Sequence, residues 1–317
     1  MKLARRELLL LLAGSACAPL RGGREPARPP TIRLGSERLR MPYDDPRAAD
    51  KAVLLARVNR DRAAHGVPPV GLDPRAALVG DLFCLDGALS GAWGHWDLAG
   101  RAPYVRWGLA GGADFHAQNA VALSVSSGRL DLPVADLLVQ AHESMMAEQP
   151  PDDGHRRTIL DPRWTHVGFG AGTAGGQFRM SQEFTRVAFD WMDVPAAPLR
   201  AGQRAWFAGR PLPGWRVGLV EIRFEPPPRP LSRAQAVARG SYGYPDEVLS
   251  LHPPLPAPFT LAPERSEVRT RRDGSIAFPF RLDHGPGYYF VLCYLQGGDG
   301  GGERMTPATA AMVTAIG

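Results

Sequence analysis

The first long stretch of patterned hydrophobic residues begins at about residue 49. Between Ala49 and Gly66, apolar residues recur at a helical spacing, and the charged residues lie mostly outside the stripe that they form. Gly66 ends this pattern, and two prolines after it prevent the helix from continuing. A second helix is predicted from Asp73-Pro74 to about Leu89, because aspartate is a good N-cap and proline is tolerated in the first turn.

A third helix and a pair of strands complete this part of the chain. The helical pattern resumes over about residues 134–148. Two strand-like runs, Thr165–Gly172 and Gln177–Ala188, are joined by Gly175-Gly176, which suits a hairpin turn. Helices combined with a short antiparallel sheet predict an α+β domain with helix, sheet and helix layers over residues 48–192.

From residue 193 onwards the pattern changes to short apolar runs between turns. The runs predicted as strands are Arg204–Ala208, Trp215–Phe224, Glu267–Arg271, Ser275–Arg281, Tyr288–Gln296 and Ala308–Ile316. The sequence Arg272-Asp273-Gly274 lies between two of them and suits a tight hairpin. This succession predicts an all-β sandwich over residues 193–317. Its stretch 272–295 loosely resembles the late strands of immunoglobulin-like modules of bacterial surface proteins.

The N-terminus has the pattern of an export signal. Residues 1–17 contain a basic start, a short leucine run and a segment of small residues that ends in a cysteine. The leucine run is too short to span a bilayer. Cys17 directly after the small residues resembles a bacterial lipoprotein signal, in which the cysteine carries lipid and anchors the mature protein to the membrane. Plain secretion and an uncleaved anchor are the alternatives, and all three predict an exported protein.

Residues 18–47 are predicted to form a tether. Prolines and arginines occur there without a helical or strand period. A proline-rich, charged segment stays extended. It would hold the folded domains away from a membrane surface.

Charge and cysteine content narrow the remaining possibilities. The formal net charge is +5, and nearly all of the positive charge comes from arginine. The arginines are scattered among aspartate and glutamate, which favours a solvated surface over nucleic-acid binding. Cys84 and Cys293 lie in apolar runs of different domains, which favours two buried thiols over a disulfide bond.

Five short motifs in the first domain resemble the CAP superfamily, which includes cysteine-rich secretory, antigen 5 and plant pathogenesis-related proteins. They are VNRDRAAHGVPPVGLDPRAALVGD at 58–81, GHWDLAGRAPYVRWG at 94–108, AQNA at 117–120, DGHRRTILDPRWTHVGFG at 153–170 and SQEF at 181–184. Each motif is weak alone, but together they follow the order and spacing of the family. The resemblance implies an α–β–α sandwich.

The family's cleft holds two histidines and two acidic residues, and the resemblance places four residues of this chain there. The histidines match His95 and His155, the first acidic position matches Gln118, and the second matches Glu148, with Glu143 as the alternative. Imidazoles and carboxylates together coordinate Zn²⁺ or a similar divalent ion. Gln118 removes one carboxylate, so the implied metal site consists of His95, His155 and water. A hydrogen-bonded cluster without metal is the alternative.

Other candidate chemistry is weaker. The run that starts with His142-Glu143 begins like the zincin motif but lacks the second histidine four residues after the first. Neither a Gly-x-Ser-x-Gly elbow nor a phosphate-binding glycine loop occurs in the sequence. His116 is expected to be a loop residue near Gln118. The tryptophans around His95 are expected either in the core or in an apolar wall for a lipid or glycan. They are Trp93, Trp96 and Trp107.

The combined prediction is an exported, lipid-anchored protein that acts as a non-enzymatic binding or interaction module at the cell envelope. Its ligand is left open among a small molecule, a lipid, a glycan and a protein, and nucleic acid is not expected. The alternative is a metal-dependent hydrolase of peptide or cell-wall material. In that alternative, a histidine-bound ion activates water and Glu148 is the base.

Overall fold

The computed structural model describes residues 31–34, 42–125, 128–254, 266–297 and 305–317. The predicted signal segment 1–17, with Cys17, and much of the predicted tether lie outside these ranges. Within the described ranges, every helix is too short or too polar to cross a membrane.

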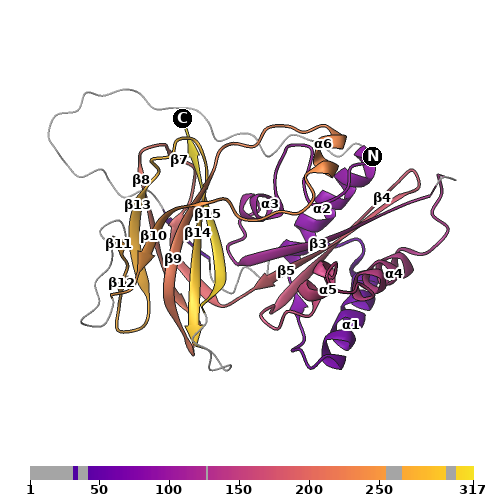
Figure 1. Cartoon of the computed structure of the whole chain (residues 1–317), viewed down its shortest axis with the longest axis horizontal. Helices are drawn as coiled ribbons and strands as arrows, with labels where there is room; N and C mark the ends of the chain where they lie inside the picture. Colours follow the sequence, from indigo (N-terminus) through magenta and orange to yellow (C-terminus); the bar gives the residue numbers. More distant parts are fainter. Residues whose placement is uncertain (1–30, 35–41, 126–127, 255–265, 298–304) are drawn as a thin grey trace.

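The first domain consists of a four-stranded sheet with helices on both faces (Figure 1). In spatial order its strands are β2 (Gly71–Leu72), β4 (His166–Ala174), β5 (Gln177–Arg186) and β3 (Phe115–Ser124). The helices are α1 (Ala48–Ala64), α2 (Pro74–Ser90), α3 (Pro103–Leu109), α4 (Val134–Met146) and α5 (Gly154–Ile159). Helix α2 covers one face of the sheet, and α1 and α4 cover the other. The predicted α–β–α arrangement is confirmed.

The two ends of α2 show how local sequence signals determine where a helix begins and ends. The Asp73 side chain accepts hydrogen bonds from the backbone N–H groups of Arg75 and Ala76, and Pro74 occupies the first helical position. At the other end, Gly91 adopts a left-handed φ of 71°, the conformation that commonly ends a helix. The predicted helix is therefore confirmed almost to the residue.

Strand β4 presents its two faces to different helices because successive side chains point to opposite faces. Val167 and Phe169 are fully buried in the core against α1 and α4. Gly168 and Gly170 face α2 instead. A Cβ atom added to Gly170 would lie only 2.2 Å from the backbone carbonyl carbon of Gly80 on that helix. The helix and the strand thus contact each other backbone to backbone.

The other described strands form two sheets that pack face to face. One sheet has the order β1 (Thr31–Leu34), β6 (Phe189–Pro195), β8 (Arg204–Pro211), β13 (Ile276–Arg281) and β12 (Arg269–Thr270). The other has the order β11 (Ser266–Glu267), β10 (Glu247–His252), β9 (Trp215–Glu225), β14 (Gly287–Gly297), β15 (Thr306–Ile316) and β7 (Leu199–Arg200). Large side chains such as Trp191, Phe207 and Tyr289 fill the space between the sheets. The predicted all-β sandwich is confirmed.

Two predicted limits need correction. Strand β6 pairs with β8 in the sandwich, so the chain leaves the first domain soon after Arg186 and not at residue 192. Strand β1 lies within the predicted tether, but it pairs antiparallel with β6, and the Thr31 hydroxyl donates to Asp193 Oδ1 at 2.8 Å. The tether prediction was wrong here because an edge strand can be held by backbone hydrogen bonds without an apolar period.

A connector from the sandwich reaches over the first domain. It joins β9 to β10 and contains α6 (Arg233–Ala238), which lies above α2 and α3 in Figure 1. The backbone N–H of Leu231 in this connector donates to the carbonyl of Leu98 at 2.9 Å. Further along, Tyr244 stacks on Tyr104 of α3 with ring centroids 4.5 Å apart. The second domain therefore contributes residues to the surroundings of the candidate site.

The two cysteines of the folded domains are free thiols, and both are buried. Cys84 lies on α2 and Cys293 on β14. Burial in apolar surroundings raises the pKa of the Cys84 thiol to about 12. The prediction of two buried thiols is confirmed.

Candidate functional site

Gln118, on β3, lies at the centre of a chain of polar side chains. Its Oε1 accepts a hydrogen bond from His95 Nδ1 at 3.0 Å, and its Nε2 donates to Glu183 Oε1 at 2.7 Å. The other carboxylate oxygen of Glu183 accepts from His116 Nε2 at 2.8 Å. Gln118 and Glu183 are directly opposite each other in the antiparallel pair β3–β5, and this register brings them together.

Glu183 is a site carboxylate that the sequence reasoning missed. Its side chain is completely buried. Burial favours the neutral acid, but the hydrogen bond and charge of His116, the charge of Arg106 and the Gln118 hydrogen bond outweigh it, so the pKa of Glu183 lies below its ordinary value. The carboxylate that Gln118 lacks is thus supplied by the next strand. The only signal in the sequence was an acidic residue inside the SQEF motif, at the middle of a predicted strand.

His116 also differs from its prediction. It belongs to strand β3 and not to a loop, its side chain is completely buried, and its ring stacks on Trp107 with centroids 5.4 Å apart. The correction follows from the strand register, because His116 and Gln118 are two residues apart and point to the same face. His116 is therefore a partner of Glu183 beneath the site.

Tyr242, in the connector after α6, contacts two members of this chain of polar side chains, Gln118 and His95. Its hydroxyl accepts a hydrogen bond from the backbone N–H of Gln118 at 2.5 Å and donates to the Gln118 carbonyl at 3.3 Å. Its ring meets that of His95 edge to face, with centroids 4.8 Å apart. Burial raises the pKa of Tyr242, so its hydroxyl stays protonated. The second domain therefore supplies one wall of the site.

His155 lies in the first turn of α5 and is held by Glu148, which follows α4. Glu148 Oε1 accepts from His155 Nδ1 at 2.5 Å, and Oε2 accepts from the His155 backbone N–H at 3.0 Å. On the other side, Asn119 Nδ2 donates to the His155 carbonyl at 3.1 Å. Glu143, the alternative to Glu148, instead forms an ion pair with Arg57 at 3.0 Å. The structure thus brings Glu148 to His155.

The two site histidines influence each other electrostatically. Burial lowers the pKa of His95, the hydrogen bond to Gln118 opposes that shift, and the charge of His155 lowers the pKa further. His95 is therefore neutral at pH 7 and carries its proton on Nδ1, the atom that faces the Gln118 oxygen. Within the described part of the chain, the Nε2 atoms of His95 and His155 have no hydrogen-bond partner.

The two histidine rings share one feature with metal-binding histidines. A metal-binding histidine typically donates its other ring N–H to an oxygen acceptor, and Gln118 and Glu148 are such acceptors for the two rings. Among the residues that the structure describes, no group of three or more His, Cys, Asp or Glu side chains is placed to hold an ion. The described chain therefore offers two imidazoles, fewer than the three or four protein ligands of ordinary zinc sites.

Glu148 is poorly placed for the role of a general base. Both of its oxygens already accept hydrogen bonds from His155, and Oε2 also accepts from the Arg156 backbone N–H at 3.4 Å. A base for hydrolysis must instead take a proton from water or substrate. Glu148 is therefore arranged to orient the His155 ring.

A second polar chain leads from β3 to α1 on the other face of the sheet. Asn119 Nδ2 donates to Gln182 Oε1 at 3.2 Å, and Gln182 Nε2 donates to His142 Nδ1 at 3.1 Å. His142 Nε2 then donates to Asp61 Oδ2 at 2.9 Å. The His142 side chain is completely buried. The residue that begins the zincin-like run thus holds α4, β5 and α1 together.

His142 is expected to make the stability of the protein depend on pH. Burial lowers the pKa of His142, and the hydrogen bond to Asp61 offsets only part of this. The unfolded chain binds the proton near the ordinary pKa of about 6.5, so the unfolded state takes up more protons as the pH falls. The free energy of unfolding should therefore decrease between about pH 7 and pH 5, by at most about 1.4 kcal/mol per pH unit from this group.

Urea unfolding at several pH values measures this slope, and His142→Gln should reduce it. His65→Gln, which removes an exposed histidine at the end of α1, is the control. An equal slope in the wild type and in His142→Gln would show that His142 does not contribute in this way.

The three tryptophans around His95 have different surroundings. Trp107 is 1% exposed and donates its indole N–H to the Asp114 carbonyl at 3.0 Å, so it belongs to the core. Trp96 lies under the guanidinium of Arg239, 4.3 Å from its ring centroid. Trp93 is 54% exposed. The core alternative is therefore confirmed for Trp107, and an apolar wall for a lipid or glycan stays a prediction for the other two.

Comparisons with known proteins give only distant likenesses. No family model matches the sequence, and no curated protein matches it. Among solved structures, an extracellular protein that contains an SCP domain, from Bacillus anthracis strain Ames, is 19% identical over 44% of this chain, with a TM-score of 0.33. This chain spans 40% of the length of that protein.

Two further solved structures are more distant in sequence. An outer surface protein from Borrelia burgdorferi is 12% identical over 46% of this chain and 98% of its own, with a TM-score of 0.36. A chitin binding domain from Burkholderia pseudomallei is 15% identical over 38% of this chain and 55% of its own, with a TM-score of 0.22. Scores this low support no conclusion about function, so the likeness to the CAP superfamily remains a resemblance based on the motifs and on the layered fold.

Proposed function

We propose that this protein is an exported, non-enzymatic binding module of the cell envelope, and that His95 and His155 form its ligand site. One observation carries the proposal. Each imidazole is held through Nδ1 by an oxygen acceptor, Gln118 or Glu148, which leaves Nε2 available. Neutral imidazole nitrogens in this orientation are ligands for Zn²⁺ and similar divalent ions.

The proposed site would hold an ion that exchanges readily with solvent. Two imidazoles from the protein leave the remaining positions of a tetrahedral shell to water or to an acidic group of a bound partner. An ion held in this way can join the protein to a ligand that carries its own donor atoms. The role proposed for the ion is therefore to mediate binding.

The positions of the nearby carboxylates favour binding over hydrolysis. The oxygens of Glu148 accept hydrogen bonds from His155, and those of Glu183 accept from His116 and Gln118. Metal-assisted hydrolysis needs a carboxylate or another base that is free to accept a proton from the attacking water. Each carboxylate next to the histidines is instead engaged in holding a ring or an amide.

The cellular location in this proposal rests on the N-terminal sequence. The signal pattern of residues 1–17 supports export, and Cys17 supports attachment to a membrane through lipid. The two folded domains would then lie outside the cytoplasm, next to the envelope. A small molecule, a glycan, a lipid or a protein remains open as the natural ligand.

Zinc titration of the purified protein by isothermal calorimetry tests the proposal. We expect one Zn²⁺ per chain in the wild type, and an affinity at least about tenfold lower in the His95→Ala/His155→Ala double variant, because both proposed protein ligands are lost. The control is His284→Ala, which removes an exposed histidine of the second domain.

Two outcomes of the titration would overturn the proposal. One is a wild-type protein that binds no divalent ion, and the other is a double variant that binds Zn²⁺ with the affinity of the wild type. Either result would show that His95 and His155 are not metal ligands. Hydrolysis of a peptide or ester panel that is lost in Glu148→Gln would replace the binding module with a metal-dependent hydrolase.

A further inference from the structure

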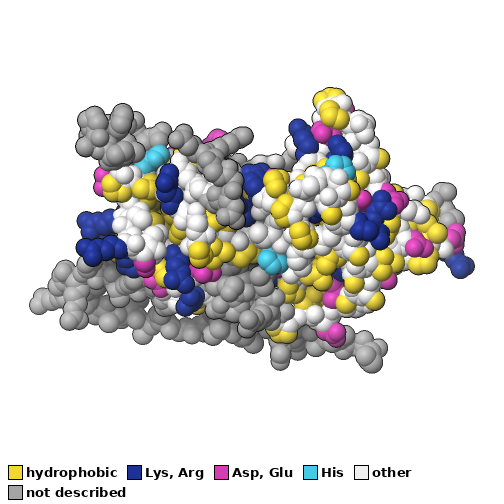
Figure 2. All heavy atoms as spheres, turned by 90° about the horizontal axis from the view of Figure 1, so that it is seen from below, with side chains coloured by type: hydrophobic (Ala, Val, Ile, Leu, Met, Phe, Trp, Pro, Cys, Tyr) yellow, Lys and Arg dark blue, Asp and Glu magenta, His cyan; other side chains and the backbone are white. Residues whose placement is uncertain are grey.

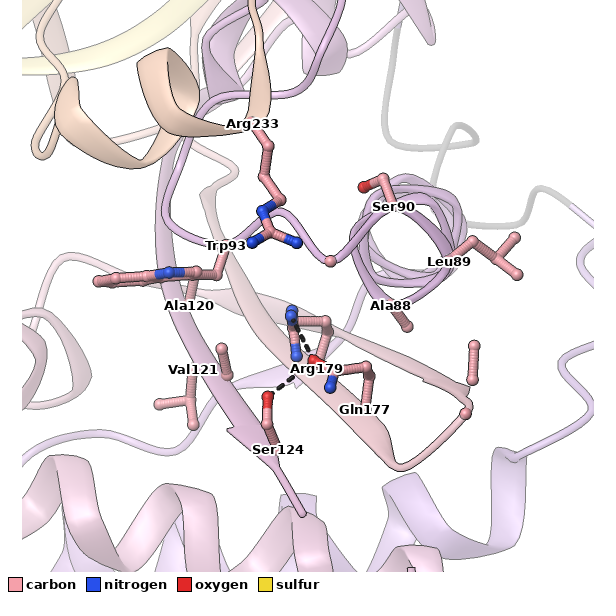
Figure 3. Close-up of a pocket in the computed structure, with 14 residues that line it drawn as sticks. Ala88, Leu89, Ser90, Trp93, Ala120, Val121, Ser124, Gln177, Arg179 and Arg233 are labelled. Atoms are coloured by element: carbon pink, nitrogen blue, oxygen red, sulfur yellow. Dashed lines mark hydrogen bonds between the residues drawn. The ribbon is translucent and has the colours of Figure 1, made fainter. Parts of the chain in front are cut away.

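A pocket of about 850 Å³ lies next to the histidine site, near the end of β3 (Figure 3). Its walls come from the C-terminal end of α2, from Trp93 in the following loop, and from β3 and β5. Arg233 of α6 lines it as well, so both domains contribute to the pocket. The volume lies in the range of small-molecule sites, about 300–1,000 Å³.

Two arginines face each other in this pocket. In Figure 3 the guanidinium of Arg233 points down from α6, and that of Arg179 points toward it from β5. Arg179 is only 5% exposed, and within the described part of the chain its hydrogen bonds go to uncharged oxygens. These acceptors are the carbonyls of Ala92, Leu123 and Phe178 and the side chain of Gln177.

The two arginines are the charged residues among those that line the pocket. None of the residues that line the pocket is acidic, and the hydrogen bonds of Arg179 within the described part of the chain go to uncharged groups. Asp86 and Asp97 line a small adjoining hollow, which Arg179 also lines, but neither aspartate lines the pocket itself. Burial and the charge of Arg233 both lower the pKa of Arg179. A buried charge is costly when it is unpaired, so a bound anion would relieve the repulsion between the two arginines.

The position of Arg233 is fixed by local structure. The Ser232 hydroxyl accepts from the Gln235 backbone N–H at 3.2 Å, and the Gln235 side chain accepts from the Ser232 N–H at 2.8 Å, which is a capping box at the start of α6. On the opposite wall, a Cβ on Gly91 would lie 3.0 Å from Arg233 Nη1. The glycine therefore leaves room for the guanidinium beside the end of α2.

The remaining walls indicate which kind of anion fits. Trp93 is 54% exposed at the side of the pocket, and the flat face of an exposed indole packs on rings. Ser124 Oγ donates to Gln177 Oε1 at 2.7 Å, so polar atoms capable of meeting hydroxyl groups lie on the wall below Arg179. The apolar lining is thin: Leu89 points away from the pocket in Figure 3, and Ala88 and Ala120 are small.

From this combination we propose that the pocket binds an acidic saccharide, a sugar ring that carries a carboxylate or a phosphate. The acidic group lies between Arg179 and Arg233, and the ring packs on Trp93. A long acyl chain has no deep apolar wall to occupy. This site is separate from the one proposed for His95 and His155, and it gives the second domain a role in binding, because Arg233 belongs to that domain's connector.

Calorimetric titration of the purified protein tests the proposal with five probes: glucuronate, glucose 6-phosphate, glucose, inorganic phosphate and adenosine monophosphate. We expect glucuronate, glucose 6-phosphate or both to bind at least about tenfold more tightly than glucose, since a charge-assisted hydrogen bond contributes about that much. Comparison of the two acidic sugars distinguishes a carboxylate from a phosphate ligand. Higher salt should weaken the binding.

Variants locate the binding. Arg233→Gln changes an exposed side chain, so folding should persist while affinity for the acidic sugar falls about tenfold or more. Trp93→Ala should weaken binding and Trp93→Phe should largely restore it. Arg239→Gln is the matched control, because this arginine of the same connector stacks on Trp96 and does not line the pocket. The His95→Ala/His155→Ala variant should bind the sugar normally.

Three results would overturn the proposal. Inorganic phosphate that binds as tightly as both acidic sugars would show an anion site without sugar recognition. Adenosine monophosphate that binds more tightly than both would identify a nucleotide site. If the protein binds neither acidic sugar, or if Arg233→Gln and Trp93→Ala bind it as tightly as the wild type does, the pocket is not the binding site for an acidic saccharide.

Discussion

Replacement of Glu183 with alanine is expected to lower the free energy of unfolding by about 3–5 kcal/mol, the range observed when one partner of a buried charge pair is removed. Glu183 accepts hydrogen bonds from His116 and Gln118 where its own side chain is completely buried. The variant would leave both donors unsatisfied, and it would remove the negative charge that most favours the charged form of the buried Arg106 guanidinium. Each of these losses destabilises the folded state and leaves the unfolded state nearly unchanged.

Urea unfolding at pH 7, followed by circular dichroism, measures this change. Glu143→Ala is the control, because Glu143 pairs with Arg57 while 46% of its side chain is exposed, and such pairs contribute about 1 kcal/mol or less. Glu183→Gln keeps the shape of the side chain and should fall between the two. A loss below about 1 kcal/mol in Glu183→Ala would contradict the view that an ionised Glu183 holds the site together.

The parts of the fold that the sequence predicts well are those with local signals. Helix α2 was predicted because Asp73 and Pro74 mark its start within the chain itself, and Gly91 ends it in the structure. The β4–β5 hairpin was predicted because Gly175-Gly176 suits its turn, and both glycines have positive φ angles in the structure. In each case the deciding residues are neighbours in sequence, so no knowledge of distant contacts is needed.

Strand β3 was missed because its stability comes from distant partners. Its ten residues include His116, Gln118 and Asn119, three buried polar residues that obscure any apolar alternation. Their hydrogen-bond partners lie on β5, on α5 and in the loops, and the β3–β5 register brings together those on the two strands. Polar residues in such a strand are tolerated because each finds a partner there.

The same reasoning explains which site residues were found. His95, Gln118, Glu148 and His155 lie in short motifs, so the resemblance located them, and the structure pairs His95 with Gln118 and His155 with Glu148. Tyr242 belongs to a connector of the second domain, 124 positions further along the chain than Gln118. No motif in the first domain could indicate such a contact. Glu183 depends on strand register in a similar way.

Gly170→Ala, which adds a single methyl group, is expected to destabilise the protein by about 3 kcal/mol or more, at the upper end of the cost of overpacking. The three atoms nearest to the added Cβ would be the backbone carbonyl carbon, carbonyl oxygen and Cα of Gly80, at 2.2, 2.3 and 2.6 Å. These are backbone atoms, so they cannot move aside as the end of a flexible side chain could. A Cβ added to Gly168 would likewise lie 2.1 Å from the backbone nitrogen of Ala77. The alanine therefore fits only if α2 moves away from β4 along its length.

Thermal and urea unfolding of Gly170→Ala can be compared with Gly243→Ala, a position whose Cβ would meet no atom within 4 Å and which should change stability by less than about 1 kcal/mol. Movement of α2 should also disturb the site around His95 and Gln118. The reason is that β4 pairs with β5, and Gly168 lies opposite Glu183 in that pair. The Gly170→Ala variant should then bind Zn²⁺ more weakly than Gly243→Ala does. A loss of stability below about 1 kcal/mol would instead show that the helix can shift without cost, and that the glycines of β4 are not required for its close packing.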